Sequence, residues 1–222
     1  MRWNLNWHKL RPIIFIFCGC LLLILIFNRP AAEYFCQKGI DYYWSEEWSK
    51  AELCFHIALA INPWLAEAHS GLGDLFSMGD ESSVVSQGSR GAEKEYRQAI
   101  RLKPDYARAH FGLGWVLNSE KEIREAIRLS PNTYRYHEVL GEFLETHKRY
   151  AEAEQEYREL LRLKPDGPET LNKLALYLDK QGRRKDARAL WERLLTLETE
   201  TLRLQTDPVM VQRIKQRLAE PD

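Results

Sequence analysis

The chain has 222 residues and a formal net charge of zero at pH 7, with 32 Lys and Arg against 32 Asp and Glu. Nucleic-acid binding depends on clustered basic side chains that neutralise phosphates, and the sequence has no basic stripe of that kind, so it excludes a nucleic-acid partner. Motifs of the HExxH, CxxC and GxSxG types and phosphate-cradling glycine motifs are also missing from the sequence. We therefore expect no catalytic activity, no metal site and no cofactor.

The N-terminal region contains an apolar run that approaches the thickness of a membrane. Residues 13–27 carry no charge, and at about 1.5 Å per residue they cover about 22 Å of a hydrocarbon layer that is about 30 Å thick. Adding Leu10, and letting Arg11 and Arg29 extend towards the headgroups, brings the run close to spanning the layer. We predict a single transmembrane anchor over residues 12–28.

A cleaved signal peptide is the alternative to an anchor, and its removal would leave a soluble secreted protein. Cleavage requires small residues at alternate positions after the apolar run. Arg29 and Pro30 stand in this stretch, and they favour a retained anchor.

Residues 1–11 form a basic and aromatic flank before the predicted anchor. Trp3 and Trp7 suit the aromatic belt at a membrane interface, and the basic residues of the flank are Arg2, Lys9 and Arg11. Because basic flanks favour the cytoplasmic side, we expect a cytoplasmic N-terminus. The rest of the chain would then lie on the periplasmic, lumenal or extracellular side.

Five stretches with helical periodicity follow the predicted anchor. The first four end in the similar runs Ile61–Pro63, Leu102–Pro104, Leu129–Pro131 and Leu163–Pro165, and the fifth ends at Leu197–Thr199. A unit of about 34 residues cannot bury its own apolar face and must stack on its neighbours. We predict an all-α solenoid of about five two-helix units, with the bounds 32–65, 66–106, 107–133, 134–167 and 168–201.

The units share small and aromatic residues at a common spacing, so that two antiparallel helices approach closely before a proline stops the second helix. The shared residues are Gly39, Ala51, Phe55, Ala58 and Pro63; Leu72, Gly73, Ala92, Tyr96, Ala99 and Pro104; Leu113, Gly114, Ala126 and Pro131; Leu140, Gly141, Tyr150, Ala153, Tyr157 and Pro165; and Leu174, Ala175, Ala187, Trp191 and Leu194. With these residues, the region 32–201 resembles the tetratricopeptide repeat (TPR) family. The resemblance implies an α-solenoid with a concave surface for binding rather than catalysis.

Two units depart from this pattern. The second has about seven extra residues in the stretch 79–91, whose Gly and Ser content predicts a projecting loop. The third lacks about seven residues near Asn118, which predicts a shortened second helix capped by Ser119 or Asn118, with distorted packing. Either these changes shape a partner site, or they are neutral variation in loops.

The segment 202–222 follows the last unit. Asp207 and Pro208 resemble an N-cap and a first helical position, so they predict a helix that continues through Leu218. Its apolar side carries Val209, Val211, Ile214 and Leu218. We expect this helix to cap the exposed end of the stack.

The four cysteines fall in two settings. Cys18 and Cys20 lie in the predicted anchor. If Gly39 packs opposite Ala51 in the first unit, then Cys36 lies opposite Cys54 at a spacing that suits a disulfide. Two free buried thiols are the alternative.

His69, His110 and His137 occupy equivalent positions in the first helices of units two, three and four. Neighbouring helices lie about 8–10 Å apart, whereas zinc needs its ligand nitrogens at about 2 Å. We therefore expect these histidines to pack within their units and not to bind a metal ion.

The resemblance also indicates where a partner would bind, because TPR arrays line their groove with the first helix of each unit. The residues on the corresponding face are Ile40, Tyr43, Trp44, Asp74, Met78, Arg108, Phe111, Trp115, Arg135, Glu138 and Glu142. Aromatic side chains and Arg are common hot spots of interfaces, although Phe111 and Trp115 could instead pack against the irregular third unit. Cys36 and Ile40 stand where members that bind chaperone tails need Lys and Asn, which argues against that activity.

Only residues 28–31 separate the predicted anchor from the first unit, so the groove would be held near the bilayer. We expect a membrane-anchored scaffold for protein–protein interaction that assembles or stabilises a membrane-associated or exported complex. Its partner would be a protein or peptide at the membrane surface, and lipid would contact residues 12–28. A constitutive structural subunit of a membrane complex is the alternative.

Overall fold

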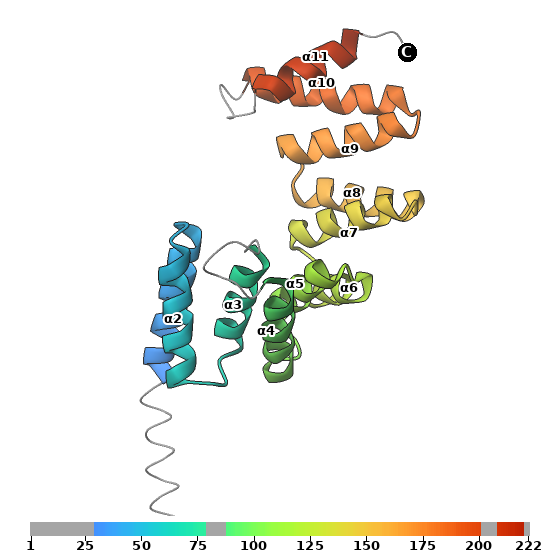
Figure 1. Cartoon of the computed structure of the whole chain (residues 1–222). Coiled ribbons are helices and arrows are strands. Elements are labelled where there is room, and N and C mark those ends of the chain that lie inside the picture. The colour runs from blue at the N-terminus through green and yellow to red at the C-terminus, as the bar shows by residue number, and fades with distance from the viewer. Residues whose placement is uncertain (1–28, 79–87, 201–207, 220–222) are drawn as a thin grey trace, which may run out of the picture. The chain divides into compact units, whose positions relative to one another are not determined.

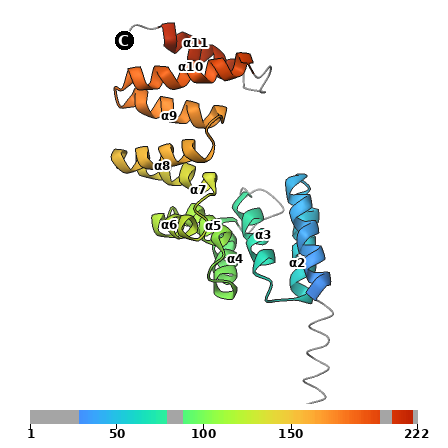
Figure 2. The ribbon, with the colours of Figure 1, turned by 180° about the vertical axis from the view of Figure 1, so that it is seen from behind.

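The computed structural model describes residues 29–78, 88–200 and 208–219, and every regular element in these ranges is a helix (Figure 1). The chain forms two compact units that divide between Leu117 and Asn118. Within each unit, consecutive helices pack side by side as antiparallel hairpins, as both views show for α7 with α8 and for α9 with α10 (Figures 1 and 2).

The described part of unit 1 begins with a helix over residues 29–44. It continues with α2 (Trp48–Ile61), α3 (Ala66–Met78), α4 (Gly88–Leu102) and α5 (Ala107–Leu117). Unit 2 contains α6 (Glu120–Leu129), α7 (Tyr134–Thr146), α8 (Tyr150–Leu163), α9 (Pro168–Lys180), α10 (Arg184–Glu200) and α11 (Pro208–Ala219).

The core of unit 1 is built around two aromatic rings, each held between glycines of two different helices. A Cβ atom at Gly39 would lie 2.7 Å from the ring of Phe55, and one at Gly71 would lie 2.3 Å from it. Tyr96 is enclosed in the same way by Gly73 and Gly112. The first helices must therefore carry glycine at these positions, because the ring from the second helix fills the space that a side chain would occupy.

In unit 2 the same arrangement recurs at Tyr157, whose ring lies 2.7 Å from the place where a Cβ atom of Gly141 would stand. Trp191 of α10 is fully buried. The last helix, α11, packs on α10 and buries Ile214. Arg188 of α10 donates a hydrogen bond of 3.1 Å to the carbonyl oxygen of Leu218.

The irregular third repeat contributes α5 to unit 1 and α6 to unit 2. Its second helix, α6, has 10 residues, against 14 for α8. Asn118 adopts a left-handed conformation with a φ of 50°, as Lys148 does before α8. The predicted side-chain cap is wrong, because Ser119 occupies the N-cap position without a side-chain hydrogen bond to the helix.

The predicted loop 79–91 is too long at its C-terminal end, because α4 already begins at Gly88. Gly91 and Ala92 are buried in that helix, and burial of small residues against α3 extends the helix further back than the Gly and Ser content indicates. Residues 79–87 lie outside the described ranges.

None of the helices within residues 29–78, 88–200 and 208–219 is both long and apolar enough to cross a membrane. The predicted flank 1–11 and anchor 12–28 lie outside these ranges.

Candidate partner-binding site

Three first helices of unit 1, namely residues 29–44, α3 and α5, carry most of the predicted groove residues. Their spacing of three or four residues places them on one face of each helix. Trp44, Met78 and Trp115 are the large apolar side chains of this set that reach solvent, with exposed fractions of 73%, 59% and 56%. Ile40 and Tyr43 pack against the core instead. We call the three exposed residues the apolar patch of unit 1.

One helical turn before Met78 on α3, Asp74 belongs to a polar centre formed by three helices. The hydroxyl of Tyr96 on α4 donates a hydrogen bond of 2.7 Å to Oδ1 of Asp74 on α3. Nη2 of Arg108 on α5 lies 2.6 Å from Oδ2 of the same carboxylate, as an ion pair. Burial raises the pKa of Asp74 above its ordinary value, and Arg108 and Tyr96 offset part of this rise. Asp74 is thus a buried charge that depends on its two partners.

The polar centre also affects Tyr43. Burial and the nearby charge of Asp74 raise the pKa of the Tyr43 hydroxyl, and Arg108 lowers it in part. Tyr43 therefore stays protonated near neutral pH and can donate a hydrogen bond towards this centre. Arg108 is the cation of the centre that remains accessible, with 37% of its side chain exposed.

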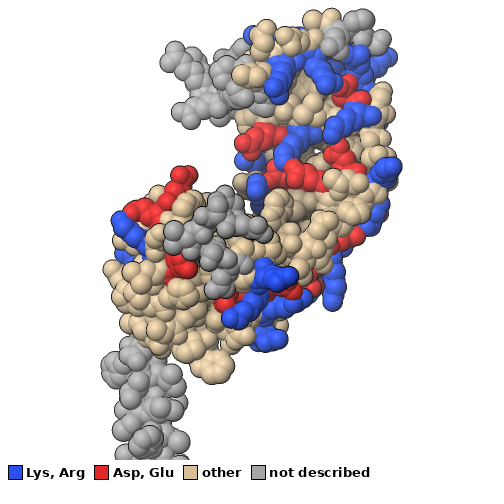
Figure 3. All heavy atoms as spheres, in the orientation of Figure 1, with Lys and Arg blue, Asp and Glu red and all other residues tan. Residues whose placement is uncertain are grey.

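In unit 2 the predicted groove residues are charged, and they are paired with each other and with α9. Nζ of Lys173 lies 2.6 Å from Oε1 of Glu138 and also pairs with Glu142. Arg135 contacts Glu138 at 3.3 Å. Burial lowers the pKa of Lys173, but the two carboxylates raise it more, so its pKa is above the ordinary value. On the visible face of unit 2, Lys and Arg side chains accordingly lie beside Asp and Glu (Figure 3).

The sequence pattern did not identify three residues that take part in these polar contacts, namely Tyr96, Glu145 and Lys173. Glu145 of α7 accepts hydrogen bonds from the Tyr157 hydroxyl at 3.0 Å and from Lys180 at 2.7 Å. In both units an acid of a first helix thus meets the tyrosine of a second helix and a base of the next first helix. An acid one repeat before a base on the same helix face is the sequence signal that could have identified these pairs.

Cys36 and Cys54 are both free and buried in the structure. Burial raises the pKa of the Cys36 thiol to about 11, with Glu67 and Arg108 among its charged neighbours. Burial also raises the pKa of Cys54, whose charged neighbour is Lys38. The two thiols thus have different surroundings within the first repeats.

The three equivalent histidines fasten each first helix to the proline run before it. Nε2 of His69, His110 and His137 lies 3.2, 3.0 and 2.9 Å from the carbonyl oxygens of Pro63, Pro104 and Pro131, respectively. Nδ1 of His137 also lies 2.7 Å from a carboxylate oxygen of Glu156. Because an acceptor faces each nitrogen of His137, the doubly protonated form of this ring is favoured. Within the described ranges, no group of three His, Cys, Asp or Glu side chains is placed to hold a metal ion.

His137 predicts a pH dependence for unit 2. Burial lowers its pKa, but the hydrogen bonds with Glu156 and the Pro131 carbonyl raise it more, so the folded pKa exceeds the unfolded value of about 6.5. The contribution of protonated His137 to the stability of unit 2 is therefore complete below a pH of about 6.5, and it is lost as the pH rises through the folded pKa. Thermal unfolding followed by circular dichroism should show this loss in the wild type and a smaller one in His137→Gln and Glu156→Gln. An unchanged pH slope in His137→Gln would contradict the assignment.

Comparisons with known proteins support the helical repeat fold. The tetratricopeptide repeat family model matches residues 85–127 and 118–168. This match shows tetratricopeptide repeats over residues 85–168. Proteins with TPR folds are typically scaffolds for protein–protein interaction, and the predicted all-α TPR solenoid is confirmed. No curated protein sequence is significantly similar to this chain.

Solved structures support the TPR fold. Pseudomonas aeruginosa pilF has a TM-score of 0.68 and 22% identity, covering 86% of this chain and 91% of its own. The thermophilic TPR protein TTC0263 of Thermus thermophilus has a TM-score of 0.61 and 18% identity, covering 84% and 98%. YrrB has a TM-score of 0.56 and 16% identity, covering 82% and 90%. At these identities the likeness concerns the fold alone.

Proposed function

We propose that this TPR protein is a membrane-anchored scaffold that holds a protein or peptide client at the membrane surface. In this proposal residues 12–28 cross the membrane once, the N-terminus is cytoplasmic, and the TPR array lies on the periplasmic, lumenal or extracellular side. Its role would be the assembly or stabilisation of a membrane-associated or exported complex. The apolar run 13–27 and the basic flank before it support the anchor and its orientation.

The observation that carries the client-binding proposal is the apolar patch of unit 1 beside the Asp74–Arg108 pair. Trp44 and Trp115 are more than half exposed, although large aromatic side chains gain most from burial. Arg108 can offer its remaining N–H groups to a carboxylate or carbonyl of a client. A peptide with apolar side chains next to an acceptor group would match this surface.

The solved structures give this proposal a parallel. YrrB is described as a TPR protein with an unusual peptide-binding site. Unit 2 offers less to an apolar client, because Glu138 and Glu142 are already paired with Lys173. We therefore place the main client contact on unit 1.

Photo-crosslinking tests the client site. A photo-reactive phenylalanine analogue at position 44 or 115 of the full chain in its native membrane should yield a defined protein adduct. Trp44→Ser and Trp115→Ser should each weaken binding of that client by about thirtyfold, as expected for an interface hot spot of about 2 kcal/mol. Leu53→Ser is the matched control, because Leu53 is similarly exposed but lies on the second helix α2, outside the patch. Equal loss of the client in all three variants would contradict the proposal.

The same membranes distinguish the alternatives. Release by alkaline carbonate would contradict the anchor and favour a secreted protein. Mild detergent could instead release the chain, without crosslinking, as one stoichiometric complex with the client that crosslinking identified. If that client does not exchange, the result would favour a constitutive subunit over an assembly factor.

A further inference from the structure

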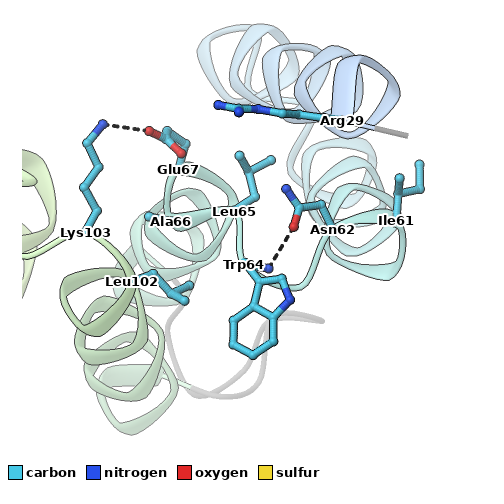
Figure 4. A pocket seen from close by; sticks show the side chains of 9 residues that line it. All are labelled: Arg29, Ile61, Asn62, Trp64, Leu65, Ala66, Glu67, Leu102 and Lys103. Atoms are coloured by element: carbon cyan, nitrogen blue, oxygen red, sulfur yellow. Dashed lines mark hydrogen bonds and ion pairs between the residues drawn. The ribbon is translucent and has the colours of Figure 1, made fainter. Parts of the chain in front are cut away.

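One edge of unit 1 gathers the start of the first helix and two turns that follow second helices. We call it the turn edge, and it consists of residue 29 and the turns 62–65 and 103–106. A cavity of about 460 Å³ opens here. Its lining residues are Arg29, Ile61, Asn62, Trp64, Leu65, Ala66, Glu67, Leu102 and Lys103 (Figure 4).

The turn edge carries an exposed indole, that of Trp64, and the basic side chains of Arg29 and Lys103 around one cavity. Trp64 is 70% exposed, and its backbone N–H donates a hydrogen bond of 3.1 Å to Oδ1 of Asn62, which fixes the turn. Arg29 and Trp64 lie on opposite sides of Leu65 in Figure 4.

The charges of the turn edge are mixed. Arg29 is paired with Glu33 at 2.9 Å, and Lys103 is paired with Glu67 at 3.0 Å. These four side chains are all exposed to solvent, so their pairs are weak and can open towards another partner. Two cations flanked by two carboxylates complement a zwitterionic group better than a purely anionic one.

The position of the edge in the chain indicates what covers it. Residue 29 directly follows the proposed anchor 12–28, so if the anchor spans the membrane, this edge starts at the headgroup layer. Trp is enriched at that depth, and Lys and Arg place their stems against apolar surface while their charges reach phosphates. The inference thus rests on the anchor of the proposed function.

We infer that the turn edge docks on the phospholipid headgroups, with Trp64 inserted at the interface and a lipid phosphate between Arg29 and Lys103. The first helix then stands away from the bilayer. Trp44 at its other end lies about 22 Å from residue 29 along the helix, whereas a headgroup layer is only about 5–8 Å thick. The apolar patch, which lies at the C-terminal ends of the first helices, is thereby held clear of the lipid and open to a client.

Lipid crosslinking tests this orientation with a matched pair of tryptophans. The full chain is reconstituted in vesicles of phosphatidylcholine, with and without phosphatidylglycerol, with a photo-reactive phenylalanine analogue replacing either Trp64 or Trp44. The two sites are similarly exposed, at 70% and 73%, and lie at opposite edges of unit 1. We expect roughly tenfold more phospholipid adduct at position 64, because position 44 lies beyond the headgroup layer.

Each outcome has a defined meaning. Adduct at position 64 in both kinds of vesicle supports docking through the shared zwitterionic headgroup. Equal adduct at the two positions, or none at position 64 in chains that resist alkaline carbonate, overturns the docking but leaves the anchor in place. A chain that carbonate removes from the vesicles overturns both. A protein rather than a lipid captured at position 64 in native membranes would show that the turn edge is a protein interface.

Discussion

Replacing Phe55 with alanine should lower the free energy of unfolding of unit 1 by about 3–5 kcal/mol. The ring fills the space between Gly39 and Gly71, and no other side chain can reach that space because both neighbouring helices are bare there. The variant would leave a cavity shared by the first two repeats. Urea denaturation followed by circular dichroism measures the change.

Two further variants make this prediction specific. Leu53→Ala lies on the same helix, but Leu53 is largely exposed, so the change should stay within about 0.5 kcal/mol. Gly71→Ala should destabilise, although alanine is normally better than glycine in a helix by about 1 kcal/mol, because the new Cβ atom would lie 2.3 Å from the Phe55 ring. A stabilising effect of Gly71→Ala would contradict the close packing of Gly71 against the Phe55 ring.

Replacing Arg108 with leucine should cost about 2 kcal/mol at neutral pH, below the usual cost of breaking a fully buried pair because Arg108 is partly exposed. Leucine keeps much of the apolar stem of Arg108, so the loss of stability measures the cost of leaving the Asp74 charge without its cation. The pKa of Asp74 is already raised by burial, and without Arg108 it rises further. The penalty applies above that pKa, where Asp74 is ionised, and shrinks as the pH falls and the carboxyl takes up a proton.

A second substitution isolates the charge. Asp74→Asn removes the ionised group but keeps an oxygen that can accept the Tyr96 hydrogen bond. Arg108→Leu should therefore cost much less in the Asp74→Asn background than in the wild type. The cycle consists of the wild type, Arg108→Leu, Asp74→Asn and the double variant. Chemical denaturation of these four proteins at two pH values measures it. Equal costs in both backgrounds would show that Arg108 acts only through packing.

Local pattern predicted much of the repeat architecture. The proline runs are followed by new helices at the expected places, and Tyr150 begins α8 as predicted. Gly141 and Tyr157 meet as their types indicate, because a small residue and an aromatic on two short antiparallel helices leave few other ways to pack. The start of α4 at Gly88 was missed, because burial against α3 outweighs the local preference of Gly and Ser for loops.

The sequence pattern alone could not predict which groove residues reach solvent. The sequence placed Ile40, Tyr43 and Trp44 on one helix face, but only the structure shows that Trp44 reaches solvent and the other two pack inward. Each residue turns a helix by about 100°, so a small rotation between helices decides which side chains a neighbour covers. The pairing of Glu138 with Lys173 depends on the same rotation between the first helices of two successive repeats.

A two-helix repeat with small, aromatic and proline positions can be recognised in the amino-acid sequence, because periodicity and steric fit are local properties. The sequence also contains the apolar run on which the anchor proposal depends. The contacts of Asp74 with Tyr96 and Arg108 and the exposure of Trp44 and Trp115 become known only from the packing of the helices. These features arise where helices from different repeats meet, and burial there depends on how the helices pack rather than on any one segment.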